Sequence, residues 1–470
     1  MSREKSLVKN TFIITIGKVC TQLVSFFLLP LYTAILTTEE YGVIDLLNTL
    51  VSLLLPIVTF QIEQALFREL IEVRGDQEAT SRTITTCLVT IFVQCAIYVA
   101  LFLSISPAIN NEYKYFLATN VISQIMVTIL LQTARGLGDN KRYAIASFCA
   151  ASCTIIFNIL FLVFARLGAN GMLLATLVSQ TLASLYLVFS LKLYKYVSIK
   201  KYSKELRTRL WKYSIPLIPN AISWWIIDAS DRVIVTSLLG VDQNGILSAS
   251  LKFAALLASM SYIFSLSWTE SIAVAINDTN IKDYFNRMLN TMLRLFIAIS
   301  IGLIAGMPFL FPLLINEKYS YGYGLVPISV IATFFNVVVG LVSVMYVAKR
   351  NTKAIASTSM LSAIINIIVH LVLIRYIGLY AAVISSLAAF LTMSIYRIFD
   401  IRKKYFDIEI NRLLVVESLV VLALILCVYY VRNPYLNVIA LLCAIVFAWY
   451  INKDTLDTIL KLAKRKVKFK

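Results

Sequence analysis

Charged side chains are scarce in this chain of 470 residues. Asp, Glu, Lys and Arg together make up 14% of it, whereas hydrophobic residues make up 59% and the mean hydropathy is +0.81. Ordinary soluble domains carry about 25% charged residues. The composition therefore excludes a typical soluble protein and predicts an integral membrane protein.

The sequence also lacks the motifs of several kinds of catalytic site. It has no G-x-x-x-x-G-K-[ST] stretch, so a P-loop that hydrolyses ATP is not expected. The seven cysteines fall in apolar runs without His or Cys partners at zinc spacing, which predicts neither a disulfide framework nor a metal site. The longest hydrophilic segment, near 192–212, is too short for a soluble catalytic domain. We therefore expect no catalytic residues, no resident cofactor and no enzymatic activity.

Long apolar runs, by contrast, recur along the whole chain. A membrane-spanning helix needs about 20 mostly apolar residues, and continuous runs of this length exclude the alternating strands of a membrane β-barrel. The candidate spans are residues 12–36, 42–66, 84–105, 115–134, 144–165, 171–191, 213–239, 245–268, 290–314, 325–347, 355–374, 379–398, 413–431 and 435–451. The predicted fold is an all-α polytopic membrane protein with about 14 transmembrane helices.

Basic residues are distributed unevenly among the predicted loops. With the N-terminus in the cytoplasm, most of the 43 Lys and Arg residues fall in cytoplasmic segments. The outer loops hold only Lys114, Arg166, Lys318, Arg375 and Arg432. This asymmetry follows the positive-inside rule and predicts that both termini are cytoplasmic. It accounts for the net charge of +18 without a nucleic-acid partner, because the basic clusters can contact anionic membrane lipids.

Two weak internal matches indicate a duplication. At an offset of 203, Gly42 in EEYGVI aligns with Gly245 in DQNGIL, and at an offset of 210 the AIAS at 144–147 recurs at 354–357. Halves with an even number of helices share one orientation, so we expect parallel repeats. The predicted parts are an N-terminal lobe of six helices (1–192), a cytoplasmic linker (193–212), a C-terminal lobe of six helices (213–400), and two further helices with a basic cytoplasmic tail (401–470).

Three ionisable residues interrupt the apolar run NAISWWIIDASDRVIV, which begins at Asn220. Asp228, Asp231 and Arg232 would each cost about 2.5 to 3.5 kcal/mol in hydrocarbon. Their i,i+3 and i,i+4 spacing places them on one side of a helix, and Lys252 is expected at a similar depth on the next helix. Two interpretations remain open. One is a neutral network that locks two helices together, with Asp228 paired to Arg232 and Asp231 to Lys252; the other is a charged cavity for a polar or anionic ligand.

The first half of the chain carries intramembrane charges as well. Lys18 lies about two turns inside the first predicted span, and Glu63 lies near the cytoplasmic end of the second. Two alternatives stay open: the two residues form an inner gate, or Lys18 extends its ammonium group to the membrane interface. Glu270 is the corresponding acid of the second half, and Asp45 is expected at the membrane interface. Burial raises the pKa of a carboxyl group. The two glutamates and the two aspartates of the preceding stretch are therefore candidates for gating or for coupling to H⁺ or Na⁺.

Three stretches resemble the Wzx-type polysaccharide repeat-unit flippases. They are SLVKNTFIITIGKVCTQLVSFFLLPLYTAILTTEEYG near the N-terminus, ARGLGDNKRYA at 134–144 and YSIPLIPNAISWWIIDASDR at 213–232. The larger superfamily includes lipid II flippases and the multidrug and toxic-compound extrusion (MATE) transporters. The resemblance implies two six-helix lobes around a central cavity, in a bacterial cytoplasmic membrane. The implied function is flipping an undecaprenyl-pyrophosphate-linked oligosaccharide to the outer leaflet, with the polysaccharide polymerase and chain-length machinery as further partners.

The resemblance also suggests roles for the residues of such a cavity. Lys18, Arg232 and Lys252 would replace the hydration of the pyrophosphate, and Asn220, Trp224 and Trp225 would meet the sugars. An amide or small polar residue is expected at Asp228 in many relatives, so its carboxylate favours an ion pair with Arg232 or a role in coupling. The alternative function is a small-molecule (drug or cation) antiporter of the same superfamily, which would favour a more acidic cavity.

Overall fold

The computed structural model describes residues 26–108, 111–276, 278, 280–349 and 351–468. Within these ranges every regular element is helical. The chain divides into two compact units, Met1–Gly245 and Ile246–Lys470. The lobes predicted from the repeat have a different boundary, at 193–212, and they stay a prediction.

Twelve helices of the described part are long and apolar enough to cross a membrane. Most of the predicted span 12–36 lies outside the described residues. Helix α10 (Ile218–Leu239) corresponds to the predicted span 213–239 but is not one of the twelve, because Asp228, Asp231 and Arg232 make it less apolar than the others. The prediction of an all-α, multi-pass membrane protein is confirmed.

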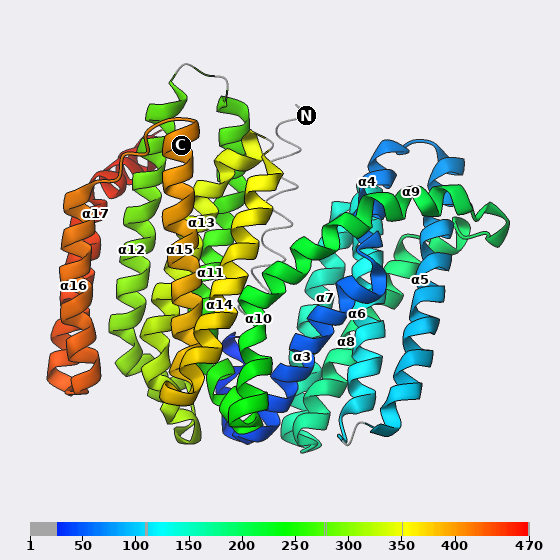
Figure 1. Ribbon diagram of the computed structural model, residues 1–470, viewed down its shortest axis with the longest axis horizontal. Helices are drawn as coiled ribbons and strands as arrows, with labels where there is room; N and C mark the ends of the chain where they lie inside the picture. Colours follow the sequence, from blue (N-terminus) through cyan, green and yellow to red (C-terminus); the bar gives the residue numbers. More distant parts are fainter. Residues whose placement is uncertain (1–25, 109–110, 277, 279, 350, 469–470) are drawn as a thin grey trace. The chain divides into compact units, whose positions relative to one another are not determined.

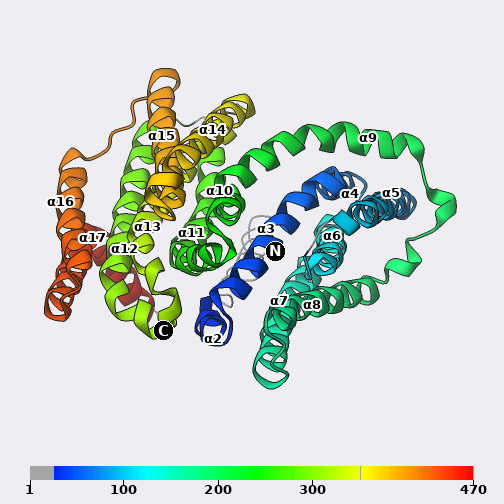
Figure 2. The ribbon, with the colours of Figure 1, turned by 60° about the horizontal axis from the view of Figure 1, so that its bottom comes forward.

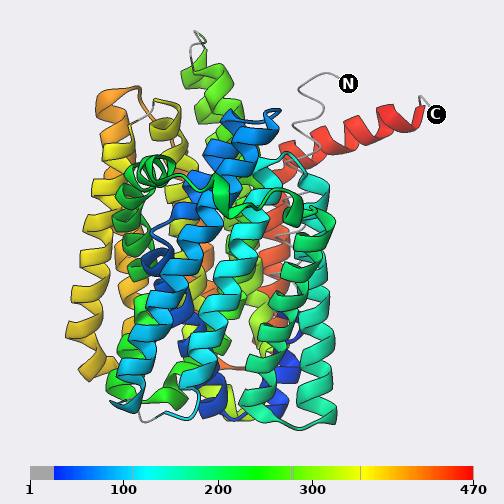
Figure 3. The ribbon, with the colours of Figure 1, turned by 90° about the vertical axis from the view of Figure 1, so that its right-hand side faces the viewer.

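Unit 1 consists mainly of long helices that lie side by side, as Figures 1 and 3 show for α5 to α8. Its helices before α10 are α2 (Leu29–Ile35), α3 (Thr38–Thr59), α4 (Ile62–Glu72), α5 (Gln77–Ile105), α6 (Lys114–Gly136), α7 (Asn140–Asn158), α8 (Gly168–Ser190) and α9 (Lys204–Ser214). Polar side chains cap the start of α3, α5, α7 and α9. Thr37 and Glu40 form a reciprocal capping box at α3, and the Asp76 carboxylate accepts two backbone N–H groups at α5.

The predicted span 42–66 is wrong at its second end. Helix α3 ends at Thr59, and α4 starts as a separate helix at Ile62. Phe60 and Gln61, which separate them, have φ angles of 52° and 57°. Two successive residues in the left-handed region cannot continue a right-handed helix, whatever their hydrophobicity. Glu63 consequently lies in α4, outside the candidate spans.

The two glycines matched by the offset of 203 contact each other within unit 1. Gly42 lies four residues after the start of α3, and Gly245 lies four residues after the start of α11 (Val241–Ala275). A Cβ on Gly42 would clash with the carbonyl oxygen of Val241, and a Cβ on Gly245 would clash with that of Thr38. Each pair of residues becomes the other when the offset is applied. This reciprocal contact supports the predicted duplication.

Unit 2 contains most of α11 and all the later helices, coloured from light green to red in Figure 1. These later helices are α12 (Ile281–Leu314), α13 (Val326–Ala348), α14 (Thr352–Ile377), α15 (Tyr380–Lys404), α16 (Arg412–Val431) and α17 (Pro434–Lys468). Helix α15 packs on both α13 and α14, whereas α12 packs on α16 and α17. The predicted last two helices, 413–431 and 435–451, thus correspond to α16 and the first part of α17.

Candidate functional site

Helix α10, which carries the predicted intramembrane charges, packs on α3 within unit 1. Near the end of α10, Arg232 forms an ion pair with Asp45 of α3, at 2.8 Å between Nε and Oδ2. The two side chains are only 20% and 15% exposed. Water therefore screens this pair less than a surface pair, and removing one partner of a buried pair typically costs about 3 to 5 kcal/mol. Asp45, which the sequence analysis places at the membrane interface, is a partner that it missed.

Trp225, about two turns before Arg232 on α10, also joins α10 to α3. Its indole Nε1 donates hydrogen bonds to the carbonyl oxygen of Thr49, at 3.0 Å, and to the hydroxyl of Ser52, at 3.1 Å. The Ser52 hydroxyl in turn donates to the Thr49 carbonyl oxygen at 2.7 Å. Trp225 therefore joins a small polar cluster on α3. This indole is held by the protein, while its ring remains half-buried.

The other predicted site residues differ in burial. Asn220 is exposed near the start of α10 and Trp224 is half-buried. Asp231 is 6% exposed, and Lys252, which belongs to unit 2, is half-buried. Lys18 and the side chains of Asp228 and Glu270 lie outside the described residues. Of the predicted cavity residues, Arg232 and Trp225 are therefore the two whose contacts with α3 are defined by distances.

Glu63 is a buried acid in the first turn of α4. It is 2% exposed, and it lies among the apolar side chains that surround Ile62 and Cys87. Its Oε2 atom has no hydrogen-bond partner in the described part of the chain. Burial raises the pKa of Glu63, while hydrogen bonds from its own backbone N–H and from the Thr59 side chain oppose the shift. This environment favours the protonated form of the carboxyl group.

The raised pKa of Glu63 predicts that stability falls as pH rises. The folded protein binds this proton more tightly than the unfolded chain. The penalty for an ionised Glu63 is therefore absent below the unfolded pKa of 4.5 and grows as pH rises through the folded pKa. Each pH unit between the two values costs up to about 1.4 kcal/mol. We expect Glu63→Gln to remove this slope, so that it melts at a higher temperature than the wild type at pH 8 and at the same temperature at pH 4.

Thermal unfolding in detergent across this pH range measures the effect. Glu72→Gln is the matched control, because Glu72 is in the same helix but is 58% exposed in a surface pair with Arg68. It should keep the wild-type slope. Parallel pH profiles for the wild type and Glu63→Gln would contradict the assignment of a raised pKa to Glu63.

Hydroxyl groups at the start of α5 hold the segment that joins α8 to α10. Ser81 and Thr85 both donate to the carbonyl oxygen of Tyr196. The backbone N–H of Ser203 donates to the Thr86 hydroxyl at 3.2 Å. The sequence TSRTITT, with a hydroxyl on most of its residues, therefore binds the linker along its backbone. Figure 2 shows α9 continuing from this linker toward α10.

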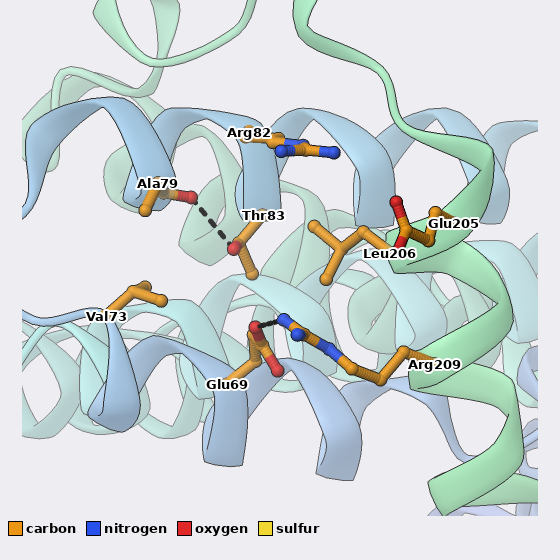
Figure 4. A pocket seen from close by; sticks show the side chains of 8 residues that line it. All are labelled: Glu69, Val73, Ala79, Arg82, Thr83, Glu205, Leu206 and Arg209. Atoms are coloured by element: carbon orange, nitrogen blue, oxygen red, sulfur yellow. Dashed lines mark hydrogen bonds and ion pairs between the residues drawn. The ribbon is translucent and has the colours of Figure 1, made fainter.

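A polar pocket of about 260 Å³ lies where α9 meets α4 and α5. Figure 4 shows Arg209 of α9 reaching Glu69 of α4, with which it forms an ion pair. Arg82 lines the opposite wall and donates to the Ser203 hydroxyl at 2.7 Å. Glu69 is almost buried, whereas the Arg209 side chain is 67% exposed. The pocket holds two acids and two arginines, with Glu205 as the second acid. These contacts hold Ser203 against α5 and α9 against α4.

Unit 2 contains a buried arginine that the sequence analysis did not single out. Arg397 of α15 is 1% exposed. Its guanidinium donates to hydroxyls of Ser343 on α13 and of Thr358 and Ser359 on α14. No carboxylate in the described residues pairs with it. A signal was present in the sequence, because polar residues recur on α14 every three or four positions, at 355–370, and so predict a polar face for a buried polar partner.

Comparison with known proteins gives a consistent family and fold. Residues 7–269 match the family described as "Polysaccharide biosynthesis protein". No curated protein matches the chain. Among solved structures, the inward-facing conformation of a multidrug resistance MATE family transporter of the MOP superfamily aligns with a TM-score of 0.67 at 13% identity, over 83% of this chain and 96% of that one.

Two further structures have the same fold. The outward-facing conformation of a multidrug resistance MATE family transporter aligns with a TM-score of 0.58 at 13% identity, over 85% of this chain and 95% of that chain. A MOP superfamily transporter from Pyrococcus furiosus with a binding pocket of reverse polarity gives a TM-score of 0.56 at 13% identity, over 84% and 95% of the two chains. These likenesses confirm the predicted MATE-like fold.

Proposed function

The chain belongs to the polysaccharide biosynthesis protein family, and on this premise we propose that it flips a polyprenyl-pyrophosphate-linked oligosaccharide across a bacterial cytoplasmic membrane. The multi-pass fold is that of transporters. We propose alternating access, with both termini in the cytoplasm. The glycan would then reach the outer leaflet, where the polysaccharide polymerase and chain-length machinery could use it.

The ion pair between Arg232 and Asp45 is the observation that supports this proposal most directly. A guanidinium matches a phosphate with the same forked geometry with which it matches a carboxylate. Arg232 can therefore exchange Asp45 for a pyrophosphate oxygen without losing a charged partner. The pair keeps the arginine neutralised between transport cycles. Lys18 and Lys252 would supply further positive charge to the same cargo.

The remaining predicted residues complete the proposal. Asn220, which is exposed on α10, and the half-buried Trp224 and Trp225 would contact the sugars. Glu63 would bind the coupling proton, because it is buried in an apolar environment. Asp228, Asp231 and Glu270 would serve as the other coupling or gating acids.

Exchanging the charges of Arg232 and Asp45 distinguishes a role of Arg232 in cargo binding from a role in the packing of α10 on α3. We expect Arg232→Ala to reduce surface polysaccharide at least tenfold. The double variant Asp45→Arg/Arg232→Asp restores an ion pair between α3 and α10 but moves the cation to the other helix. We expect it to recover protein abundance without recovering export. Surface polysaccharide and membrane abundance, measured in cells that depend on this protein, report the two properties.

Arg68→Ala is the control, because Arg68 is a 58% exposed arginine of unit 1 that pairs only at the surface. It should leave export unchanged. Full export by the exchanged variant would mean that Arg232 acts only in packing. The MATE-like fold favours one competing function, efflux of small organic cations. Unimpaired polysaccharide in cells lacking the protein, together with lost efflux of ethidium, would overturn the flippase proposal in its favour.

A further inference from the structure

Two cavities of opposite character adjoin each other in unit 2. One is a polar cavity of about 940 Å³ at the start of α12, and the other is an apolar groove of about 260 Å³ between α12, α13, α15 and α16. Ile410, in the segment that joins α15 to α16, lines both. On α12, Arg294 lines the polar cavity and its neighbour Leu293 lines the groove. The two spaces therefore form one amphipathic site.

Two asparagines of α12 that line the polar cavity hold the segment that carries Ile410. Asn286 donates to the carbonyl oxygen of Asp407 at 3.0 Å and accepts the backbone N–H of Glu409 at 3.0 Å. One turn later, Asn290 donates to the carbonyl oxygen of Glu409 at 2.6 Å and accepts the N–H of Asn411 at 3.2 Å. These four hydrogen bonds fix the segment that carries Ile410. The site is therefore a rigid part of unit 2.

The polar cavity presents charges of both signs. Arg287 and Arg294 lie two turns apart on α12, and they supply its positive charge. Asp283, Glu409 and Asp454 supply its negative charge. Arg294 lies 3.6 Å from Asp454, at the limit of an ion pair, and the guanidinium of Arg287 has no ion pair or hydrogen bond among the described residues. The cavity thus offers an available cation beside carboxylates.

The groove is apolar and has the length of one membrane leaflet. Its wall on α12 runs from Leu293 to Ile304, which is about 16 Å at 1.5 Å per residue. Half of a bilayer's hydrocarbon core is about 15 Å. The hydroxyls of Ser300 and Ser418, which border the groove, donate to carbonyl oxygens of their own helices at 2.7 and 2.6 Å. Their polarity is satisfied, so the wall is suited to a hydrocarbon chain.

We propose that this site binds one phospholipid of zwitterionic headgroup, with its phosphate at Arg287 and Arg294, its ammonium group at the carboxylates, and one acyl chain in the groove. The two signs of charge fit such a headgroup better than a pyrophosphate, which would face three carboxylates. A groove of one leaflet's depth fits an acyl chain better than a long polyprenyl chain. The site is independent of the proposed transport function.

Native mass spectrometry of the full chain, extracted in mild detergent from membranes rich in phosphatidylethanolamine, tests the proposal. The wild type should retain one phosphatidylethanolamine molecule. We expect Arg287→Ala/Arg294→Ala to reduce the retained fraction at least tenfold. Ser418→Phe, which places a ring in the groove, should do the same while leaving the charges in place.

Arg375→Ala is the matched control, because Arg375 is an exposed arginine in the last turn of α14, a helix of unit 2 that lines neither cavity. It should retain the lipid as the wild type does. The arginine variants remove solvent-exposed or half-buried side chains, so they keep the test valid if Ser418→Phe fails to fold. Retention by the double arginine variant, absence of lipid from the wild type, or a polyprenyl phosphate in its place would each overturn the proposal.

Discussion

Replacing Gly42 or Gly245 by alanine is expected to prevent most of the protein molecules from folding. The new methyl group of Gly42→Ala would overlap the carbonyl oxygen of Val241 and come within 2.9 Å of the Gly245 nitrogen. Gly245→Ala meets the Thr38 carbonyl in the same way. Overpacking usually costs about 1 to 3 kcal/mol, and we expect more here because the obstacle is backbone. Fluorescence-detected size-exclusion chromatography measures the folded fraction.

Gly302→Ala in α12 is the control for these two substitutions. A Cβ at Gly302 meets no atom within 4 Å, and alanine is favoured over glycine inside a helix by about 1 kcal/mol. This variant should therefore equal or exceed the wild type in folded yield. Because the two clashes are reciprocal, the Gly42 and Gly245 variants should lose similar yields. A wild-type yield from either one would show that the helices do not approach this closely.

The second large effect is expected at Arg397. Arg397→Ala would leave a cavity among α13, α14 and α15 and remove every hydrogen bond that joins them through this side chain, at a cost of about 2 to 5 kcal/mol. Arg397→Lys should be comparably unstable, although it keeps the charge. An ammonium group is compact and has three donors, so it cannot reach the hydroxyls of both Ser343 and Thr358 as the guanidinium does.

Arg397→Met distinguishes side-chain volume from charge. It fills much of the same space, and the Ser343 and Thr358 hydroxyls keep carbonyl acceptors in their own helices. We expect it to melt at a higher temperature than Arg397→Ala and Arg397→Lys. Thermal unfolding in detergent ranks the three variants. If Arg397→Lys were as stable as the wild type, a positive charge alone would be sufficient at this position.

The sequence predicts the helices well because their lengths and composition depend on the bilayer. Twelve candidate spans of the described part correspond to predicted apolar runs. The break between α3 and α4 was missed because Phe60 and Gln61 are neither glycine nor proline. Their left-handed conformation depends on how the two helices pack, and helix packing involves contacts distant in sequence. Apolar periodicity contains no information on such contacts.

The candidate site was predictable in position but not in pairing. Spacing along one helix identifies Arg232 as an intramembrane cation and shows which residues are its neighbours on α10. It does not show which residue of the facing helix lies opposite, and so it did not identify Asp45. Arg397 was missed for a related reason, since counting charges assigned it to the end of a span. Its burial follows from three helices meeting around it.

The docked linker has a mechanical consequence for helix α10. The Thr86 hydroxyl accepts the backbone N–H of Ser203, and Glu69 pairs with Arg209, so the linker and α9 are held against α4 and α5. A single turn, Ile215–Leu217, separates α9 from α10. This covalent path has little slack. A displacement of the ends of α4 and α5 would therefore be transmitted to α10 through α9 and this turn. The proton proposed for Glu63 would act on Arg232 by the same route.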